Sequence, residues 1–98
     1  MRYSFEWHVE KEKQNRRRHR ISFVQATTVF QDPNQVTTFD EDHSDAEDRW
    51  ITLGFDKNGI LLVVIHTVEE TERYMNIRII SARKATRAET KQYEEFNQ

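Results

Sequence analysis

The chain has 98 residues, a net charge of −2 at pH 7 and no cysteine. This length predicts one domain over residues 1–98, and the lack of cysteine excludes a disulfide scaffold and a thiolate metal site. The longest apolar run, Ile60 to Ile65, is much shorter than the roughly 20 residues of a membrane span. The first residues also lack the apolar core of a secretory signal. We therefore expect a soluble cytoplasmic protein.

Charge is segregated along the chain. Residues 16–20 form a basic block, and residues 40–48 form an acidic one. A second basic group follows late in the sequence and comprises Arg78, Arg83, Lys84 and Arg87. Such segregation suits a protein that has one anionic and one cationic partner, although a simply solvated surface would give the same pattern.

The first third of the chain predicts one strand and two helices. Residues 2–7 alternate between apolar and polar side chains, as in a half-buried strand. Residues 9–19 are good helix formers with almost no apolar stripe, which predicts an exposed helix. A second helix is expected from about Phe23 to Gln31, with Ser22 as its capping residue and Pro33 as its stop.

The middle of the chain predicts a series of strands. Residues 35–39 read as a short strand, and the acidic segment 40–48 reads as a loop with room for one helical turn. Residues 50–55 alternate again, and residues 56–59 form a turn in which Asn-Gly allows positive φ. The continuously apolar run 60–65 is typical of a central strand that is covered on both faces.

The last third predicts a polar turn at residues 68–73, a long strand at residues 74–82 and a final helix. The helix is expected to begin with a capping box of Thr86 and Glu89 and to end near Phe96. Strict alternation along the strand would put Met75, Ile77, Ile79 and Ser81 on one face. It would put Tyr74, Asn76, Arg78, Ile80 and Ala82 on the other.

The resulting order is β-α-α-β-β-β-β-α. Successive strands joined by short turns imply an antiparallel meander. We therefore expect an α+β fold with a small antiparallel or mixed sheet, helices packed on one of its faces, and the other face partly open.

The four histidines are the first candidates for chemistry, because only histidine titrates near neutral pH without perturbation. No pair has metal-ligand spacing, and no glycine-rich phosphate loop is present, so the motifs imply neither a metal nor another cofactor. His8 is expected on the surface, His19 at a helix C-terminus, and His66 in a half-buried packing position. His43, in the acidic loop, suits either a turn or a reactive role.

Acid–base chemistry on an anionic substrate fits the remaining residues. RNA can be cleaved without a metal if side chains move protons at the 2′-hydroxyl and the leaving oxygen, and if cations hold the phosphate. His43 or Glu47 could be the general acid or base. Arg78 and Arg83 could hold the scissile phosphate, with Arg49 on a neighbouring one. Because these residues come from different segments, their spacing does not demonstrate that they converge.

Lys84 and Arg87 are further candidates for RNA binding. Both lie beside the start of the last helix, where the helix dipole disfavours cations. A local mismatch of this kind is more readily tolerated at a functional site, although a charged helix start is the plain alternative.

The chain also resembles the BrnT family, the toxins of type II toxin–antitoxin systems, over roughly residues 5–93. The most specific segments are Phe5-Glu-Trp7 and the run from Arg78 to Arg83 that is followed by Ala85. Other matching positions are Asn15, His19, Ile21, Ser22, Phe23, Ala26, Val29, Phe30, Asp32, Pro33, His43, Ser44, Glu47, Arg49, Gly54, Gly59, Ile77, Arg87, Glu89 and Tyr93.

The resemblance implies a RelE-like fold and a ribonuclease activity that arrests translation. It also implies a cognate BrnA-type antitoxin with a ribbon-helix-helix part, through which operator DNA would be bound indirectly. The reactive positions that match are His43, Glu47, Arg49, Arg78 and Arg83. Position 20 departs from the family, which often has glycine there, and this affects the turn between the first two helices.

Two other functions are compatible with the sequence. One is a non-catalytic module that binds an antitoxin as a corepressor and has lost ribonuclease activity. The other is direct DNA binding by the basic helix of residues 11–20, which is less favoured because no DNA-binding motif surrounds it.

Overall fold

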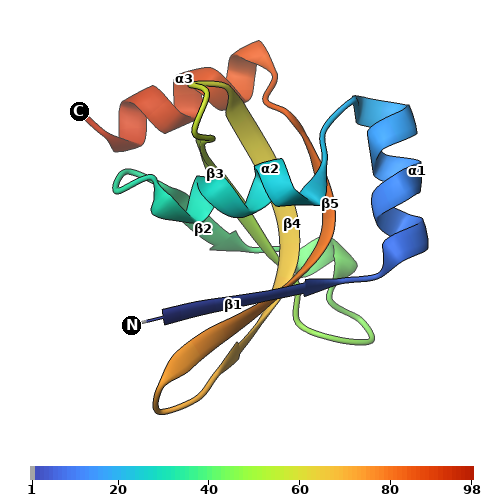
Figure 1. Ribbon diagram of the computed structural model, residues 1–98. Helices are drawn as coiled ribbons and strands as arrows, with labels where there is room; N and C mark the ends of the chain where they lie inside the picture. Colours follow the sequence, from blue (N-terminus) through green and yellow to red (C-terminus); the bar gives the residue numbers. More distant parts are fainter. Residues whose placement is uncertain (1) are drawn as a thin grey trace.

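Five strands and three α-helices form the fold in the computed structural model, which describes residues 2–98 (Figure 1). The strands are β1 (Arg2–Trp7), β2 (Val36–Phe39), β3 (Trp50–Phe55), β4 (Leu61–Glu70) and β5 (Tyr74–Lys84). The helices are α1 (Val9–His19), α2 (Phe23–Thr27) and α3 (Arg87–Phe96). Two short 3-10 helices are η1 (Thr28–Gln31) and η2 (Glu41–His43). The predicted element order is therefore confirmed.

The strands form one mixed sheet in the order β1-β5-β4-β3-β2. Strands β2 to β5 make an antiparallel meander, as expected, and β1 joins its outer edge parallel to β5. The α+β class is confirmed. No helix among residues 2–98 is long and apolar enough to cross a membrane.

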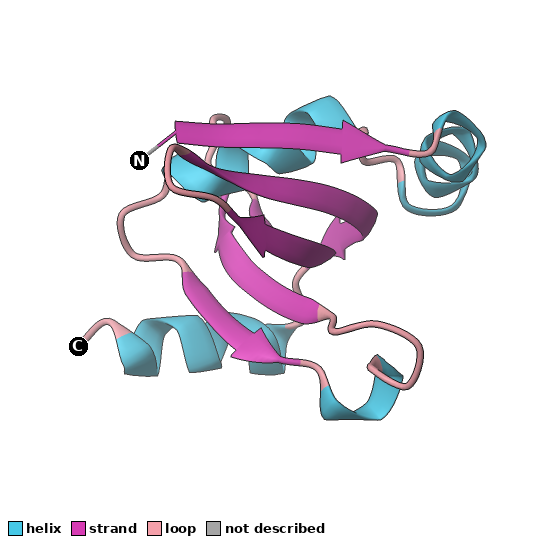
Figure 2. Cartoon of the chain, turned by 90° about the horizontal axis from the view of Figure 1, so that it is seen from below, coloured by secondary structure: helices cyan, strands magenta, loops and turns pink. Residues whose placement is uncertain are grey.

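The helices cover both faces of the sheet, which corrects the expectation that they share one face. Seen from below, α2 and α3 lie on opposite sides of the strands (Figure 2). Phe23 and Ala26 of α2 pack with Leu62 of β4 in the larger core cluster. Tyr93 of α3 packs with Leu61 in a second cluster, because successive residues of β4 point to opposite faces. The apolar run of β4 is thus covered on both faces, as its composition predicts.

A β-bulge in β5 corrects the predicted face assignment. Ser81 pairs with Ile65 and Ile79 pairs with His66, so Ile80 is an extra residue. Beyond it the alternation is reversed, and Ala82 joins the cluster that contains Ile77 and Ile79. The same shift puts the positions of Arg78 and Arg83 on one face of the sheet. Strict alternation would put them on opposite faces, because they are an odd number of residues apart.

The hairpin between β4 and β5 is longer than predicted. Residues 68–70 belong to β4 instead of to a turn, and residues 83–84 extend β5. The turn is confined to residues 71–73, where Thr71 Oγ1 and Thr71 N both donate to Tyr74 O. The hairpin therefore projects beyond β3, which begins opposite His66.

Helix α1 covers the part of β5 that β1 leaves free. Pairing between β1 and β5 stops at Ile79, and the buried Asn15 side chain binds the edge further along. Its amide donates to Ala82 O at 2.8 Å and to Ile21 O at 2.9 Å, and its oxygen accepts from Ala82 N at 3.1 Å. One side chain thus satisfies backbone groups that would otherwise be buried without partners.

The helix ends follow local sequence signals. Ser22 caps α2 by accepting from Gln25 N, and Thr86 forms the predicted capping box with Glu89. Arg20 ends α1 in the left-handed region, with φ of 62° and ψ of 27°. An L-residue with a side chain is disfavoured there, and glycine is the usual choice.

Candidate active site

The loop between β2 and β3 is held in shape by one hydroxyl. Ser44 Oγ donates to Asp40 O at 2.5 Å and accepts from Arg49 N at 3.0 Å. Asp40 N also donates to Arg49 O at 2.9 Å, which closes the base of the loop. The acidic segment thus forms a closed loop that contains one short 3-10 helix, η2. The closed base fixes the backbone from which the side chains of His43 and Arg49 extend.

His43 and Asp40 form a pair that leaves one imidazole nitrogen free for chemistry. His43 Nδ1 lies 3.1 Å from each carboxylate oxygen of Asp40, which is buried, whereas the imidazole is two-thirds exposed. An ionised carboxylate only accepts hydrogen bonds, so the proton is on Nδ1 and Nε2 faces away from Asp40. This is how a carboxylate orients a histidine for proton transfer.

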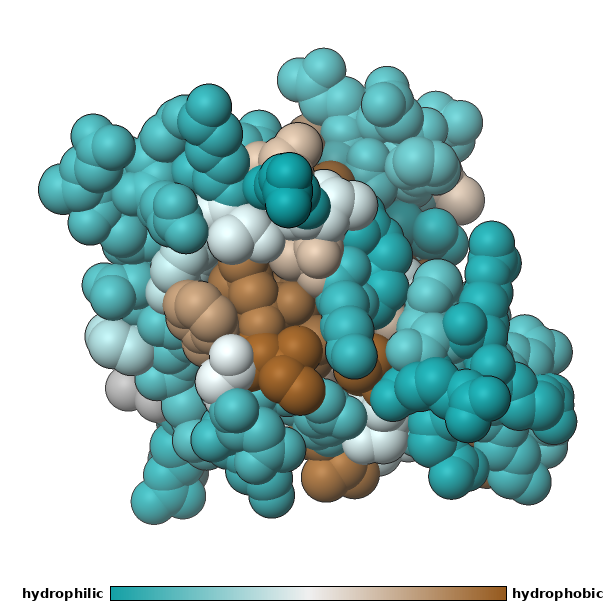
Figure 3. Space-filling model, turned by 90° about the horizontal axis from the view of Figure 1, so that it is seen from above, coloured by the Kyte–Doolittle hydropathy of each residue, from teal (hydrophilic) through white to brown (hydrophobic). Residues whose placement is uncertain are grey.

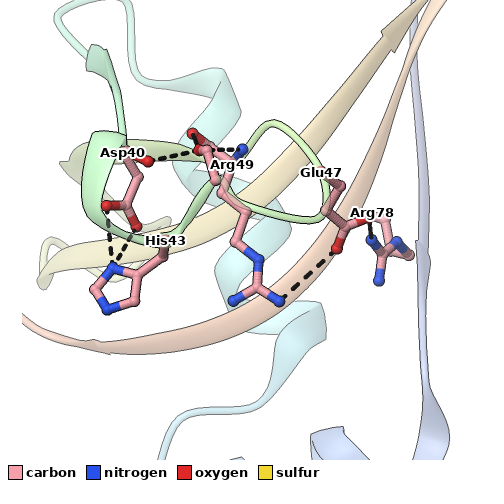
Figure 4. Close-up of polar contacts among 6 residues, drawn as sticks. Asp40, His43, Glu47, Arg49 and Arg78 are labelled. Carbon is pink, nitrogen blue, oxygen red and sulfur yellow. Dashed lines mark hydrogen bonds and ion pairs between the residues drawn. The ribbon is translucent and has the colours of Figure 1, made fainter.

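Glu47 bridges two arginines that come from different elements. Its Oε2 accepts from Arg78 Nη2 at 2.5 Å, and its Oε1 lies 3.8 Å from Arg49 Nη2. Figure 4 shows Glu47 and Arg78 pointing toward one another, and Arg49 between His43 and Glu47 in that view. The hydrogen bond from Arg78, together with the charges of Arg78, Arg49 and Lys11, lowers the pKa of Glu47. Glu47 is therefore an ionised carboxylate at neutral pH.

Arg49 has hydrogen-bonding capacity to spare. Among residues 2–98, its Nε is buried and has no hydrogen-bond partner. A buried donor without a partner is costly, and such groups often mark a functional site. The 3.8 Å contact with Glu47 leaves the guanidinium available for an anion.

The structure places Arg83 away from this cluster. Its Nη1 and Nη2 donate to the two carboxylate oxygens of Glu89 at 2.8 and 2.9 Å. Five residues of strand separate it from Arg78, which corresponds to about 16 Å. Lys84 and Arg87 are exposed beside it, at the end of β5 and the start of α3. Glu89 offsets the unfavourable placement of these cations near a helix N-terminus.

The other three histidines have structural or surface positions. His8 is exposed before α1, and His19 is the last residue of α1. His66 is fully buried instead of half-buried, and its Nε2 lies 2.7 Å from Thr52 Oγ1. Burial lowers the pKa of His66 to about 4, so its imidazole is neutral at physiological pH.

A cleft of about 520 Å³ opens on the face that carries His66. Its aromatic lining comes from Tyr3, Phe30 and Trp50, and its charged lining residues are Asp48 and Glu70. Arg78, which pairs with Thr67, points to the opposite face of the sheet. An anionic ligand is therefore favoured on the Arg78 face and disfavoured in this cleft.

Sequence reasoning missed Asp40 and Ser44, which hold the loop. Their signal was present, since both lie within three residues of His43. It also gave no role to Asp32, although it made the following Pro33 the stop of the second helix. Asp32 Oδ2 accepts from Tyr93 Oη at 2.7 Å and from Phe55 N at 2.8 Å. A Cβ on Gly54 would come within 2.9 Å of a Val29 methyl. Asp32, Tyr93, Gly54 and Val29, which all match the family, therefore have structural roles.

No group of three or more His, Asp or Glu side chains within residues 2–98 is arranged to hold a metal ion. The sites that the described residues do form are built from guanidinium, carboxylate and imidazole groups. These groups bind anions and move protons.

Comparisons with known proteins agree with this chemistry. A family model described as the ribonuclease toxin BrnT of type II toxin–antitoxin systems matches residues 7–89. The 1.1 Å crystal structure of the Brucella abortus ribonuclease toxin BrnT has a similar fold, with a TM-score of 0.59. That comparison covers 89% of this chain and 100% of the other at 19% identity. No curated protein is a significant match. The chain belongs to the BrnT family of ribonuclease toxins of type II toxin–antitoxin systems.

Proposed function

We propose that this toxin is a metal-independent endoribonuclease that acts in the cytoplasm and inhibits translation by cutting RNA. Residues 1–98 act as a single catalytic domain, and its five described strands belong to one sheet. The main support is the bridge that Glu47 makes between Arg49 and Arg78, because Glu47 belongs to the same closed loop that presents His43. Glu47 occupies the place of an anion between two cations, and a phosphate has the charge and geometry to take that place.

The reaction is a transesterification within the RNA. The 2′-oxygen attacks the neighbouring phosphorus, the bond from phosphorus to the 5′-oxygen breaks, and the products end in a 2′,3′-cyclic phosphate and a 5′-hydroxyl. The 2′-hydroxyl proton leaves to a base, and the departing 5′-oxygen takes a proton from an acid. His43 Nε2 carries one of these transfers, with Asp40 orienting the ring.

Arg78 and Arg49 hold the phosphate and stabilise the charge that builds on its oxygens. Glu47 is a positioning residue in this scheme, because an ionised carboxylate with a lowered pKa is a weak base and cannot be an acid at neutral pH. Arg83, Lys84 and Arg87 contact RNA beyond the scissile bond. The Arg83–Glu89 pair supports a role in which Arg83 is held in place at the head of α3.

The cognate partner is a BrnA-type antitoxin with a ribbon-helix-helix part, and it alone contacts operator DNA. The family match supports an antitoxin partner, because members of a type II system are neutralised by a protein. The resemblance in sequence supports the antitoxin type. The charge of the Arg78 face favours RNA there, so a basic DNA-binding partner is expected to dock elsewhere.

Cleavage of a labelled single-stranded RNA by the purified protein in EDTA tests the activity. The expected products carry a 2′,3′-cyclic phosphate and a free 5′-hydroxyl, and His43→Ala should reduce the rate about 10²–10⁴-fold. Expression without antitoxin should arrest growth. RNA that stays intact, together with normal growth and a stable antitoxin complex, would instead identify a non-catalytic corepressor.

A further inference from the structure

A basic groove runs between α1 and the bulged part of β5, next to the proposed active site. It has a volume of about 240 Å³, and its charged or titratable lining residues are Lys11, Arg18 and His19. Ile80 and Ser81 of β5 form the opposite wall. The surface over α1, on the right in Figure 3, is hydrophilic, in keeping with a helix that has one buried residue.

The positions of the cations on α1 follow from the way the helix is attached. Asn15 is bound to the edge of β5, so the stripe of α1 that contains it faces the sheet. Lys11 and Arg18 are four residues before and three residues after Asn15, and both lie on that stripe. Seven residues of helix separate them by about 10 Å, which is the rise of roughly three stacked nucleotides of one strand.

These two cations are available to a ligand. Other cations of α1 are used within the helix, since Lys13 pairs with Glu10 and Arg16 pairs with Glu12. In the part of the chain that the structure describes, neither Lys11 nor Arg18 makes a salt bridge. Both are exposed. Neither charge is therefore engaged in a salt bridge within the described residues.

The groove adjoins the Glu47–Arg78 pair. The charge of Lys11 contributes to the lowered pKa of Glu47, which places the head of the groove near that carboxylate. Ile80 and Ser81 also lie two and three residues after Arg78 along β5. A strand of RNA whose phosphate lies at Arg78 can thus continue into the groove.

We propose that the groove between α1 and β5 is a binding site for the RNA backbone, in which Lys11 and Arg18 hold phosphates on one side of the scissile one. This proposal rests on the proposed ribonuclease function and assigns it a substrate track. The backbone of β5 and the anchored α1 form a preorganised wall. The track accounts for a charged helix that buries little apolar surface.

The test compares two double variants of α1 with equal charge. Lys11→Ala with Arg18→Ala removes the groove cations, whereas Lys13→Ala with Arg17→Ala removes two cations from a different face of α1. The probe is a single-stranded RNA oligonucleotide with a 2′-O-methyl group at every position, which keeps the ribose 2′-oxygen but cannot be cut. Its binding is measured by fluorescence anisotropy over a range of salt concentrations.

Each phosphate contact contributes about 0.7 to the slope of log affinity against log salt for a single strand. The groove variant should therefore lose about 1.4 from this slope, and the control variant should keep the wild-type slope. With cleavable RNA, the groove variant should raise KM at least tenfold and leave kcat within about twofold. Equal slopes for both variants, or a larger loss of slope for the control, would overturn the proposal that the groove binds the RNA backbone.

The binding result is independent of catalysis. If the wild-type protein fails to cut RNA in EDTA, the proposed function fails, but a slope loss confined to the groove variant would still locate the nucleic-acid track. If wild-type cleavage is observed and the slopes do not differ, only the groove is refuted. Circular dichroism melting of both variants verifies that each remains folded.

Discussion

Glu47 and Arg78 are 31 residues apart in the sequence, yet the carboxylate of one accepts a hydrogen bond from the guanidinium of the other at 2.5 Å. The contact joins the acidic loop to the long strand β5. The sequence placed these charges in separate blocks, and the fold brings the two blocks together at one point. The chemistry of the active site therefore depends on what each member of the pair does.

Glu47→Gln distinguishes a positioning carboxylate from a general base. The amide keeps the size of the side chain and one acceptor for Arg78, so we expect kcat to fall by less than about tenfold. His43→Ala should lower kcat by about 10²–10⁴-fold and should also remove a limb of the pH–rate profile. If Glu47→Gln were the variant that removes that limb, the roles of the two residues would be reversed.

His66 should make stability depend on pH in a defined window. Its pKa is lowered by burial from 6.5 to about 4, so the unfolded chain binds a proton that the folded protein does not. Its contribution is complete above pH 6.5 and is lost as pH falls toward 4. The expected loss is on the order of 2–3 kcal/mol in the free energy of unfolding.

Urea unfolding at pH 7 and pH 4.5 measures this effect, with His66→Gln as the matched variant. The glutamine keeps a polar contact for Thr52 but does not titrate, so its stability should change less between the two pH values. His19→Gln, which alters a histidine at the end of α1, should retain the wild-type dependence. A His66→Gln profile parallel to that of the wild type would contradict the assignment.

The Arg83–Glu89 pair predicts that stability also depends on pH in a second, more acidic range. The hydrogen bond from Arg83, helped by Thr86, lowers the pKa of Glu89 from 4.5 to about 2. Its contribution is thus present above pH 4.5 and is lost as pH falls toward 2. Because the Arg83 side chain is 41% exposed, solvent screening limits the contribution to about 1 kcal/mol.

Glu89→Gln should therefore lower the melting temperature at pH 6 by a few degrees and have little effect at pH 2. Glu95→Gln, on the same helix, is the control and should change neither value. Equal melting temperatures for Glu89→Gln and the wild type at pH 6 would show that the pair contributes nothing to stability.

Arg20→Gly should stabilise the protein. The residue adopts φ of 62°, which glycine reaches without the steric cost that a Cβ imposes. The expected gain is about 1 kcal/mol, or roughly 4–8 °C in melting temperature for a domain of this size. Arg17→Gly, inside α1, is the control and should cost about 1 kcal/mol. A lower melting temperature for Arg20→Gly would contradict the argument.

Local signals in the sequence were enough to predict the elements. Alternation located β1, β3 and β5, and a continuous apolar run located β4. Ser22 and Thr86 marked helix starts that the structure confirms. The family resemblance also identified position 20 as unusual, and the backbone there has the left-handed conformation that favours glycine. These features depend on residues that are near one another in sequence.

Features that depend on distant contacts could not be predicted. The extra residue at Ile80 follows from a register shift between two strands, and no local pattern marks it. The placement of α3 on the second face depends on Tyr93 reaching Asp32, which is 61 residues away. The association of Arg83 with Glu89 could have been anticipated, since the capping box already placed Glu89 beside the end of β5.

Arg78→Ala tests directly whether Arg78 holds the scissile phosphate in a metal-independent reaction. The measurement is the single-turnover rate of RNA cleavage in EDTA, with enzyme in saturating excess and Arg17→Ala as the control. Loss of transition-state charge stabilisation should reduce the Arg78→Ala rate about 10²–10³-fold, without a matching loss of melting temperature, and leave the control near the wild type. A folded Arg78→Ala protein that cuts RNA within twofold of the wild-type rate would contradict the account.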